Sequence, residues 1–128
     1  MKIKISKLDA KFSHYVRWIR DKGVCQRCKT QYHPPTSGLH CSHFHGRAAK
    51  STRFNLDNVA SLCHGCHAYF HGHPVQHYEF FMKRLGEHKF QCLDLFANTP
   101  TKVDYGVIEL WLDNEIRRSD VDILGRKA

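Results

Sequence analysis

Four cysteines in the chain have a spacing that suits a metal ion. Cys25-Gln-Arg-Cys28 and Cys63-His-Gly-Cys66 are two CxxC pairs. The two-residue gap lets both sulfurs of a turn face one ion, and two such turns complete the tetrahedron of thiolates that Zn²⁺ prefers. A closed site of this kind leaves no position for a substrate, so we expect a structural zinc ion. Redox chemistry at one pair is the alternative interpretation.

A second set of residues combines histidine and asparagine around the cysteine pairs. His43 is followed by Asn58, then by His67 and His71. Residues i and i+4 lie on one face of a helix, so His67 and His71 can present both imidazoles to one cation. Adjacent helix positions point about 100° apart, so Cys66 can bind the zinc while His67 serves this second ion. A neutral imidazole at His43 can accept a proton from water near pH 7.

The spacing of apolar side chains predicts the elements that position these residues. Residues 6–21 carry apolar side chains at helical spacing, with Ser6 as the N-terminal cap and Gly23 as the stop. Four basic residues are expected on the solvent side of this helix: Lys11, Arg17, Arg20 and Lys22. Residues 23–73 contain most of the Cys, His and Gly, and predict short strands and loops closed by one short helix.

Two amphipathic helices are predicted in the C-terminal part, over residues 75–97 and 103–119, with a turn between them. Gly86 could interrupt the first of these helices. Their aromatic side chains are expected to pack in the core: Tyr78, Phe80, Phe81, Phe96 and Trp111. The second helix also offers a surface through which two copies of the chain could pair as a homodimer.

Composition restricts the class of protein. The chain has 128 residues, of which 41% are hydrophobic and 25% charged, values typical of one folded domain rather than a disordered segment. No apolar run approaches the roughly 20 residues of a membrane-spanning helix, and the start of the chain lacks the apolar stretch of a secretory signal. We therefore expect no membrane partner and a cytoplasmic location, where a Cys-rich chain binds metal more readily than it forms disulfides.

The positive charge is concentrated in the first half of the chain. Residues 1–60 hold twelve Lys and Arg against three Asp and Glu, whereas residues 61–128 hold eight against nine. A one-sided basic field attracts polyanions, so DNA or RNA is the expected partner. A solvated basic surface is the alternative.

These motifs resemble the HNH endonucleases of the ββα-metal (His-Me finger) type over residues 25–71. The resembling segments are CQRC, LHCSHF, NLDNVASLC and CHGCHAYFH. The chain is more similar still to the NinG (Rap) recombination nucleases of lambdoid phages over residues 7–96, through KLDAKFSHYVRWIRDKGVCQRC, CSHFHGRAAKSTRFNLDNV and GHPVQHYEFFMKRLGE. The resemblance implies two strands and a helix that hold one divalent cation, and hydrolysis of phosphodiester bonds in DNA.

The resemblance also implies a role for each matching residue. His43 would be the general base, Asn58 would hold the adjoining loop, and His67 would complete the catalytic set and bind the divalent cation with His71. His45 and His73 are also near in the sequence and are the alternatives for the second ligand. That cation would be Mg²⁺, Mn²⁺, Ni²⁺ or Zn²⁺, and imidazole ligands favour the transition ions. Three basic residues in the loop after the base are expected to contact DNA phosphates, with plain solubility as the alternative: Arg47, Lys50 and Arg53.

The chain departs from the family pattern directly before the base. Many relatives have an Asp or His metal ligand there, whereas this chain has Ser42. Either Cys41 or His40 could complete the ligand set, and strand alternation places Cys41 on the same face as His43.

The expected architecture is therefore a single α+β domain over residues 1–128. It would comprise a basic N-terminal helix (1–22), a zinc-bound HNH core (23–73) and a helical C-terminal part (74–128).

The expected function is metal-dependent HNH endonuclease activity on DNA, lost below about pH 6 as His43 protonates. The NinG resemblance further implies branched substrates (Holliday junctions, D-loops) in phage recombination, in the host cytoplasm if the chain is phage-encoded. The alternative, which Ser42 favours, is a non-catalytic zinc-containing DNA-binding module.

Overall fold

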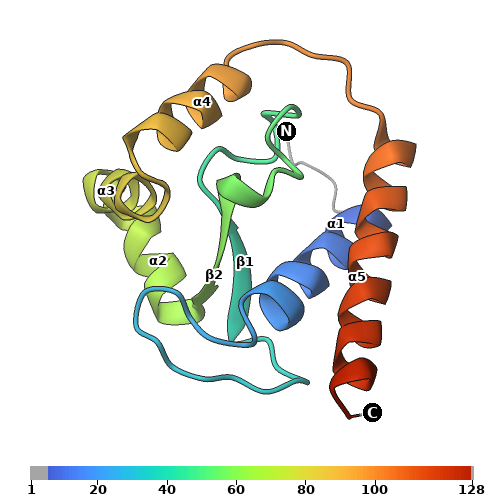
Figure 1. The fold of residues 1–128 in the computed structure, drawn as a ribbon. Helices are drawn as coiled ribbons and strands as arrows, with labels where there is room; N and C mark the ends of the chain where they lie inside the picture. The colour runs from blue at the N-terminus through green and yellow to red at the C-terminus, as the bar shows by residue number, and fades with distance from the viewer. Residues whose placement is uncertain (1–5, 128) are drawn as a thin grey trace.

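The computed structural model describes the backbone of residues 6–127 and the side chains of residues 6–119. Within this range the fold is α+β, with five α-helices around one two-stranded sheet (Figure 1). The elements in chain order are α1 (Lys7–His14), the π-helix η1 (Tyr15–Arg20), β1 (Leu39–His43), the 3-10 turn η2 (Leu56–Asn58), β2 (Val59–Cys63), α2 (His64–Gly72), α3 (Pro74–Leu85), α4 (Glu87–Ala97) and α5 (Tyr105–Lys127). Residues 1–5 of the predicted basic segment lie outside the described residues.

The N-terminal helix begins where the sequence predicts. The Ser6 hydroxyl accepts a hydrogen bond from the Asp9 backbone N–H at 3.1 Å, and the Asp9 carboxylate accepts one from the Ser6 N–H at 2.8 Å. This reciprocal cap satisfies two backbone donors at the helix start. After α1 the chain continues as η1 and turns at Gly23, which has a φ of 77°. A Cβ atom there would lie 2.5 Å from the Tyr32 carbonyl, so the turn requires glycine.

The expectation that Arg20 faces solvent is wrong. Its guanidinium donates to the carbonyls of Leu56 at 2.6 Å and Val59 at 2.8 Å, and pairs with Asp21. The reason is that β2 and the turn before it pack against η1, and their carbonyls need a donor there. Arg20 therefore links the N-terminal helix to the sheet.

The two strands pair antiparallel, with Leu39 opposite Cys63 and His43 opposite Val59. All five residues of β2 are buried because the sheet is covered on both faces. Val59 packs with Phe12 of α1, whereas Leu62 packs with Phe70 of α2. Figure 1 shows the same layering, with α1 and α5 on one side of the sheet and α2 and α3 on the other. Helix α2 begins directly after β2, so strand, strand and helix form one compact unit.

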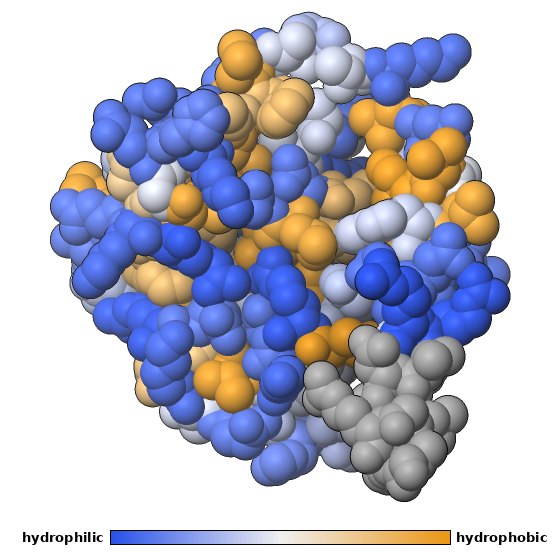
Figure 2. All heavy atoms as spheres, in the orientation of Figure 1, coloured by the Kyte–Doolittle hydropathy of each residue, from blue (hydrophilic) through white to orange (hydrophobic). Residues whose placement is uncertain are grey.

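The C-terminal helices follow the prediction in outline and differ in packing. Gly86, with a φ of 84°, separates α3 from α4 as expected. Phe81 is fully buried, but Tyr78, Phe96 and Trp111 are 44%, 53% and 37% exposed, so their assignment to the core is wrong. Each of α3, α4 and α5 buries one face, through Phe81, Phe90 and Leu112 respectively, and the exposed rings lie at other positions of these helices. Figure 2 shows exposed hydrophobic side chains over the first turns of α5. None of the helices in the described range has the length and apolar character to cross a bilayer.

Candidate functional site

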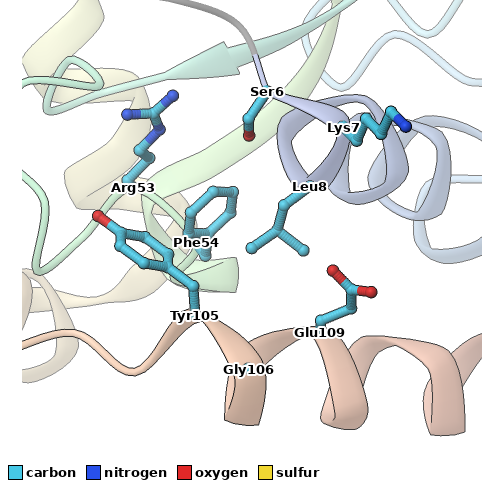
Figure 3. Close-up of a pocket in the computed structure, with 8 residues that line it drawn as sticks. All are labelled: Ser6, Lys7, Leu8, Arg53, Phe54, Tyr105, Gly106 and Glu109. Atoms are coloured by element: carbon cyan, nitrogen blue, oxygen red, sulfur yellow. The ribbon is translucent and has the colours of Figure 1, made fainter.

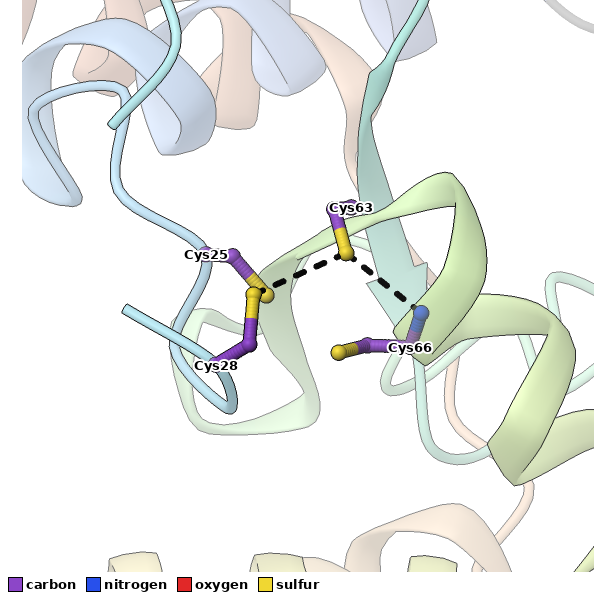
Figure 4. Close-up of side chains that lie close together, drawn as sticks. All are labelled: Cys25, Cys28, Cys63 and Cys66. Atoms are coloured by element: carbon purple, nitrogen blue, oxygen red, sulfur yellow. Dashed lines mark hydrogen bonds between the residues drawn. The ribbon is translucent and has the colours of Figure 1, made fainter. Parts of the chain in front are cut away.

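The four predicted zinc ligands meet at one point of the structure. Cys25 and Cys28 come from the loop after η1, Cys63 ends β2, and Cys66 lies in the first turn of α2 (Figure 4). Their four sulfur atoms all lie within 4.8 Å of one another, and the Sγ atoms of Cys28 and Cys63 are 3.8 Å apart. A tetrahedron of sulfurs ~2.3 Å from a central ion has edges of roughly 3.8 Å. The cluster can therefore hold a structural zinc ion.

Local donors prepare these sulfurs for a metal. The Cys66 backbone N–H donates to Cys63 Sγ at 3.4 Å, and Arg27 donates to Cys66 Sγ at 3.4 Å. The hydrogen bonds between Cys28 and Thr30 lower the pKa of the Cys28 thiol to about 6. Burial raises the pKa of Cys66 to about 12, so a nearby cation would be needed to keep this thiol deprotonated.

His43 is oriented by a single hydrogen bond to the backbone. Its Nε2 lies 2.9 Å from the carbonyl oxygen of Arg53. A carbonyl can only accept, so Nε2 carries the proton and the neutral ring has its lone pair on Nδ1. Burial, aided by the positive charge of Arg47, lowers the pKa of His43 to about 4. The expectation that His43 protonates near pH 6 is therefore wrong, since the ring stays neutral well below that pH.

The structure brings His43 together with two of the other predicted residues. His43, His67 and His71 line one cavity of about 260 Å³, between the end of β1, helix α2 and the start of α3. The other lining residues are Ser42, Phe44, Gly46, Phe70, Pro74 and His77. The side chain of a neutral imidazole and those of two potential metal ligands thus line the same cavity.

Asn58 does not line this cavity; it holds the loop that follows His43. Its side chain is fully buried. The amide oxygen accepts from the His45 N–H at 2.8 Å, and the amide nitrogen donates to the carbonyls of His45 at 2.9 Å and Thr52 at 3.0 Å. Its own carbonyl accepts from the Phe44 N–H at 2.8 Å. Asn58 alone therefore connects residues 44, 45 and 52 of the loop between the two strands.

A family comparison matches most of this chain. The family model described as "Bacteriophage Lambda NinG protein" matches residues 3–115, a stretch that includes both cysteine pairs and all the cavity residues. The chain belongs to the NinG family. Membership suggests a phage protein related to recombination. No curated protein and no solved structure matches the chain.

Two residues of this NinG-family protein, Cys41 and His40, could replace Ser42 as a ligand, and the structure places them in different surroundings. Cys41 is buried in the core beside Leu8 and Phe12, and its desolvation raises the pKa of the thiol to about 12. That position faces away from α2. His40 points toward α2, and its Nδ1 lies 2.8 Å from Nδ1 of His67.

One histidine of the cavity was not predicted from the sequence as a site residue. His77 comes from α3, and its Nε2 is buried with no hydrogen-bond partner among the described residues. Its ring stacks on Phe70 at a centroid distance of 5.2 Å, and burial lowers its pKa. An orphaned neutral nitrogen beside two metal-ligand candidates fits a site that binds a further polar group. The spacing of His73 and His77, one helical turn apart, was the available signal.

The predicted phosphate contacts have different surroundings. Arg53 binds the Asp9 carboxylate through Nε at 3.0 Å, and Arg47 Nε lies 3.7 Å from the same carboxylate. Lys50 is exposed in the loop. The NinG-family chain therefore presents one solvent-exposed and two acid-paired cations at this edge, and their contact with DNA stays a prediction.

A wider cavity of about 710 Å³ lies elsewhere, between the start of α1, residues 53–54 and the start of α5 (Figure 3). Figure 3 shows the side chains of Leu8, Phe54 and Tyr105 along its wall, with Arg53 at one side. Of the predicted site residues, Arg53 is the one that lines it. The predicted histidines His43, His67 and His71 line the smaller cavity and not this one.

Proposed function

We propose that this NinG-family protein is a metal-dependent endonuclease of the HNH type, which hydrolyses phosphodiester bonds in DNA. The proposal rests on which ring nitrogen of His43 carries the proton. Its Nε2–H is held by the Arg53 carbonyl, which leaves Nδ1 as the proton acceptor of a ring that lines the same cavity as His67 and His71. A positioned base of this kind typically contributes ~10²–10⁴-fold to a reaction.

Each residue has a defined part in the proposed reaction. His43 Nδ1 accepts the proton of the attacking water, while the Arg53 carbonyl holds the ring and stabilises its protonated form. Asn58 keeps the loop that contains Arg53 in place. His67 and His71 would hold a divalent cation, which when bound would supply a Lewis acid next to the phosphate. The four-cysteine cluster would fix the start of α2, and with it the position of His67.

The substrate part of the proposal rests on charge and on family membership. The +9 balance of residues 1–60 favours a polyanion. The NinG family supports a place in phage recombination. We therefore propose branched recombination intermediates, Holliday junctions and D-loops, as the preferred DNA substrates.

The test is a cleavage assay on branched and linear DNA with Mn²⁺ or Mg²⁺, comparing wild type with His43→Ala. His33→Ala is the matched control, because His33 is an exposed histidine in the loop before β1. We expect cleavage by wild type and the control, and at least ~10²-fold slower cleavage by His43→Ala. Equal rates for wild type and His43→Ala would refute the assignment of the base.

A second candidate function is a non-catalytic zinc module that binds DNA. The observation that favours it is Ser42, which is 1% exposed and occupies the position where relatives have a metal ligand. DNA binding that weakens steeply with salt, without cleavage under any divalent cation, would support this function over the first.

A further inference from the structure

Two histidines of the candidate site are joined end to end, and the first is anchored to the backbone. His40 Nε2 lies 3.0 Å from the carbonyl oxygen of Ser37, in the loop before β1. His40 Nδ1 lies 2.8 Å from Nδ1 of His67, in the second turn of α2. The backbone of one segment is thereby connected through two rings to a predicted metal ligand of another.

The direction of these hydrogen bonds follows from the carbonyl. The Ser37 oxygen can only accept, so the proton of His40 is on Nε2 and the neutral ring has its lone pair on Nδ1. At 2.8 Å, His67 must therefore donate its Nδ1–H to that lone pair. The lone pair of His67 is then on Nε2, the nitrogen that does not face His40. The carbonyl of Ser37 thus sets the tautomers of both rings.

The cavities beside His67 are consistent with a ring whose Nδ1 faces His40 and whose Nε2 faces elsewhere. His67 lines two hollows, one of about 290 Å³ that it shares with His40 and His64, and the other of about 260 Å³ that it shares with His43. His71 lines both cavities as well. With Nδ1 directed to His40, Nε2 is the nitrogen available to the cavity of the general base.

We infer that His40 is a positioning residue that holds His67 in the tautomer whose Nε2 can bind the divalent cation. This inference rests on the proposed function for the identity of that cation site. Metal-binding histidines usually donate their second N–H to an acceptor, and loss of that acceptor typically weakens metal binding ~10–100-fold. In this protein the acceptor is another imidazole.

The distance between the rings favours this role over direct ligation by His40. Two nitrogens bound to one tetrahedral ion at ~2.0–2.1 Å would be roughly 3.3–3.4 Å apart. The observed separation of 2.8 Å is that of a hydrogen bond between the rings. His40 therefore acts through His67 and not as a ligand in place of Ser42.

The test compares His40→Asn with His40→Ala in zinc-loaded protein. An Asn side chain places its amide oxygen near the position of Nδ1 and can accept from His67, whereas Ala cannot. We expect long-range ¹H–¹⁵N NMR, without a second cation, to show His67 protonated on Nδ1 in wild type and His40→Asn. In His40→Ala the tautomer should shift toward Nε2–H.

Calorimetric titration with Ni²⁺ gives the second measurement. His40→Ala should bind Ni²⁺ at least ~10-fold more weakly than wild type, with His40→Asn and the control His33→Ala close to wild type. Wild-type His67 protonated on Nε2, or equal weakening by His40→Asn and His40→Ala, would overturn the inference. The wild-type tautomer and His40→Asn settle the question even if His40→Ala does not fold. Neither measurement depends on DNA cleavage, so failure of the proposed nuclease activity would be seen separately.

Discussion

Asp9 of α1 forms an ion pair with Arg53 of the loop before η2. The carbonyl of the same Arg53 binds His43, the candidate general base. Arg53 donates from Nε to one carboxylate oxygen at 3.0 Å and from a terminal nitrogen to the other at 2.5 Å, while its carbonyl accepts from His43. Burial raises the pKa of Asp9, but the hydrogen bonds from Arg53 and Ser6 outweigh it, so the pKa falls to about 2. Helix α1 therefore holds the residue that orients His43.

Replacing Asp9 should have two opposite effects. Asp9→Asn removes the charge that pairs with Arg53 and Arg47, so the free energy of unfolding should fall by about 1–3 kcal/mol. The same change leaves Arg47 without its acidic neighbour, so DNA binding at low salt should tighten and depend more steeply on salt. Chemical denaturation and salt titrations of DNA binding measure these effects. The control Asp113→Asn affects an exposed pair with Lys11 and should change stability far less than Asp9→Asn does. An Asp9→Asn variant as stable as this control would contradict the prediction.

Asn58→Ala should strongly destabilise the loop between the strands. It removes three side-chain hydrogen bonds, leaves the N–H and carbonyl of His45 without this partner, and leaves the Thr52 carbonyl with the Asn55 N–H as its donor, which should cost about 2–4 kcal/mol of unfolding free energy. Asn55→Ala loses one bond, to the Asp57 N–H, and should cost about 0.5–2 kcal/mol. Urea denaturation of the two variants gives the comparison. Similar losses would mean that Asn58 is not the main support of this loop.

The pH dependence should reflect the lowered pKa of His43. Because the folded-state pKa is about 4, cleavage at saturating cation should stay nearly constant between pH 7 and pH 5. In the unfolded chain the same ring has a pKa of ~6.5. Between pH 4 and pH ~6.5 the unfolded state therefore binds more protons than the folded state. The stability contribution is therefore full above pH 6.5 and is lost as the pH falls toward 4, by roughly 3 kcal/mol. Initial rates and denaturation midpoints across this range measure both effects. A rate that halves near pH 6.5 would contradict the burial of this ring.

Metal content should separate the cysteine cluster from the histidine cavity. Cys63→Ser should lose zinc and several kcal/mol of stability, because Cys63 joins the end of β2 to both halves of the cluster. Cys92→Ser, remote from the cluster in α4, is the matched control and should retain one zinc per chain. His67→Ala should also retain zinc and fold, yet lose cleavage. Elemental analysis with thermal melting provides the readout, and equal loss of fold in Cys63→Ser and His67→Ala would show that the two sites are one.

Replacing His77 by an apolar aromatic residue should raise the free energy of unfolding. His77→Phe removes the unpaired buried Nε2 and keeps contacts with Phe44, Phe70 and Phe81, so the unfolding free energy should rise by about 1 kcal/mol. Ni²⁺ affinity and cleavage should fall if this nitrogen serves a bound group in the cavity. Denaturation and Ni²⁺ titration of the same variant measure the two effects. A destabilised variant would indicate that Nε2 has a partner such as a bound water.

Local features of this protein could be predicted from its sequence. The capped start of α1, the break at Gly86 and the two CxxC pairs depend on residues close together in the chain, where spacing determines geometry. The i, i+4 placement of His67 and His71 on one helix is of the same kind.

Only the tertiary structure determined the surroundings of those residues. Arg53 meets Asp9, His40 meets His67, and His77 enters the cavity because packing brings separate segments together. The lowered pKa of His43 has the same origin, since burial by the surrounding segments is its largest cause. Residue types and spacing along the chain state which groups are available, but desolvation and long-range partners depend on how the helices close over the sheet.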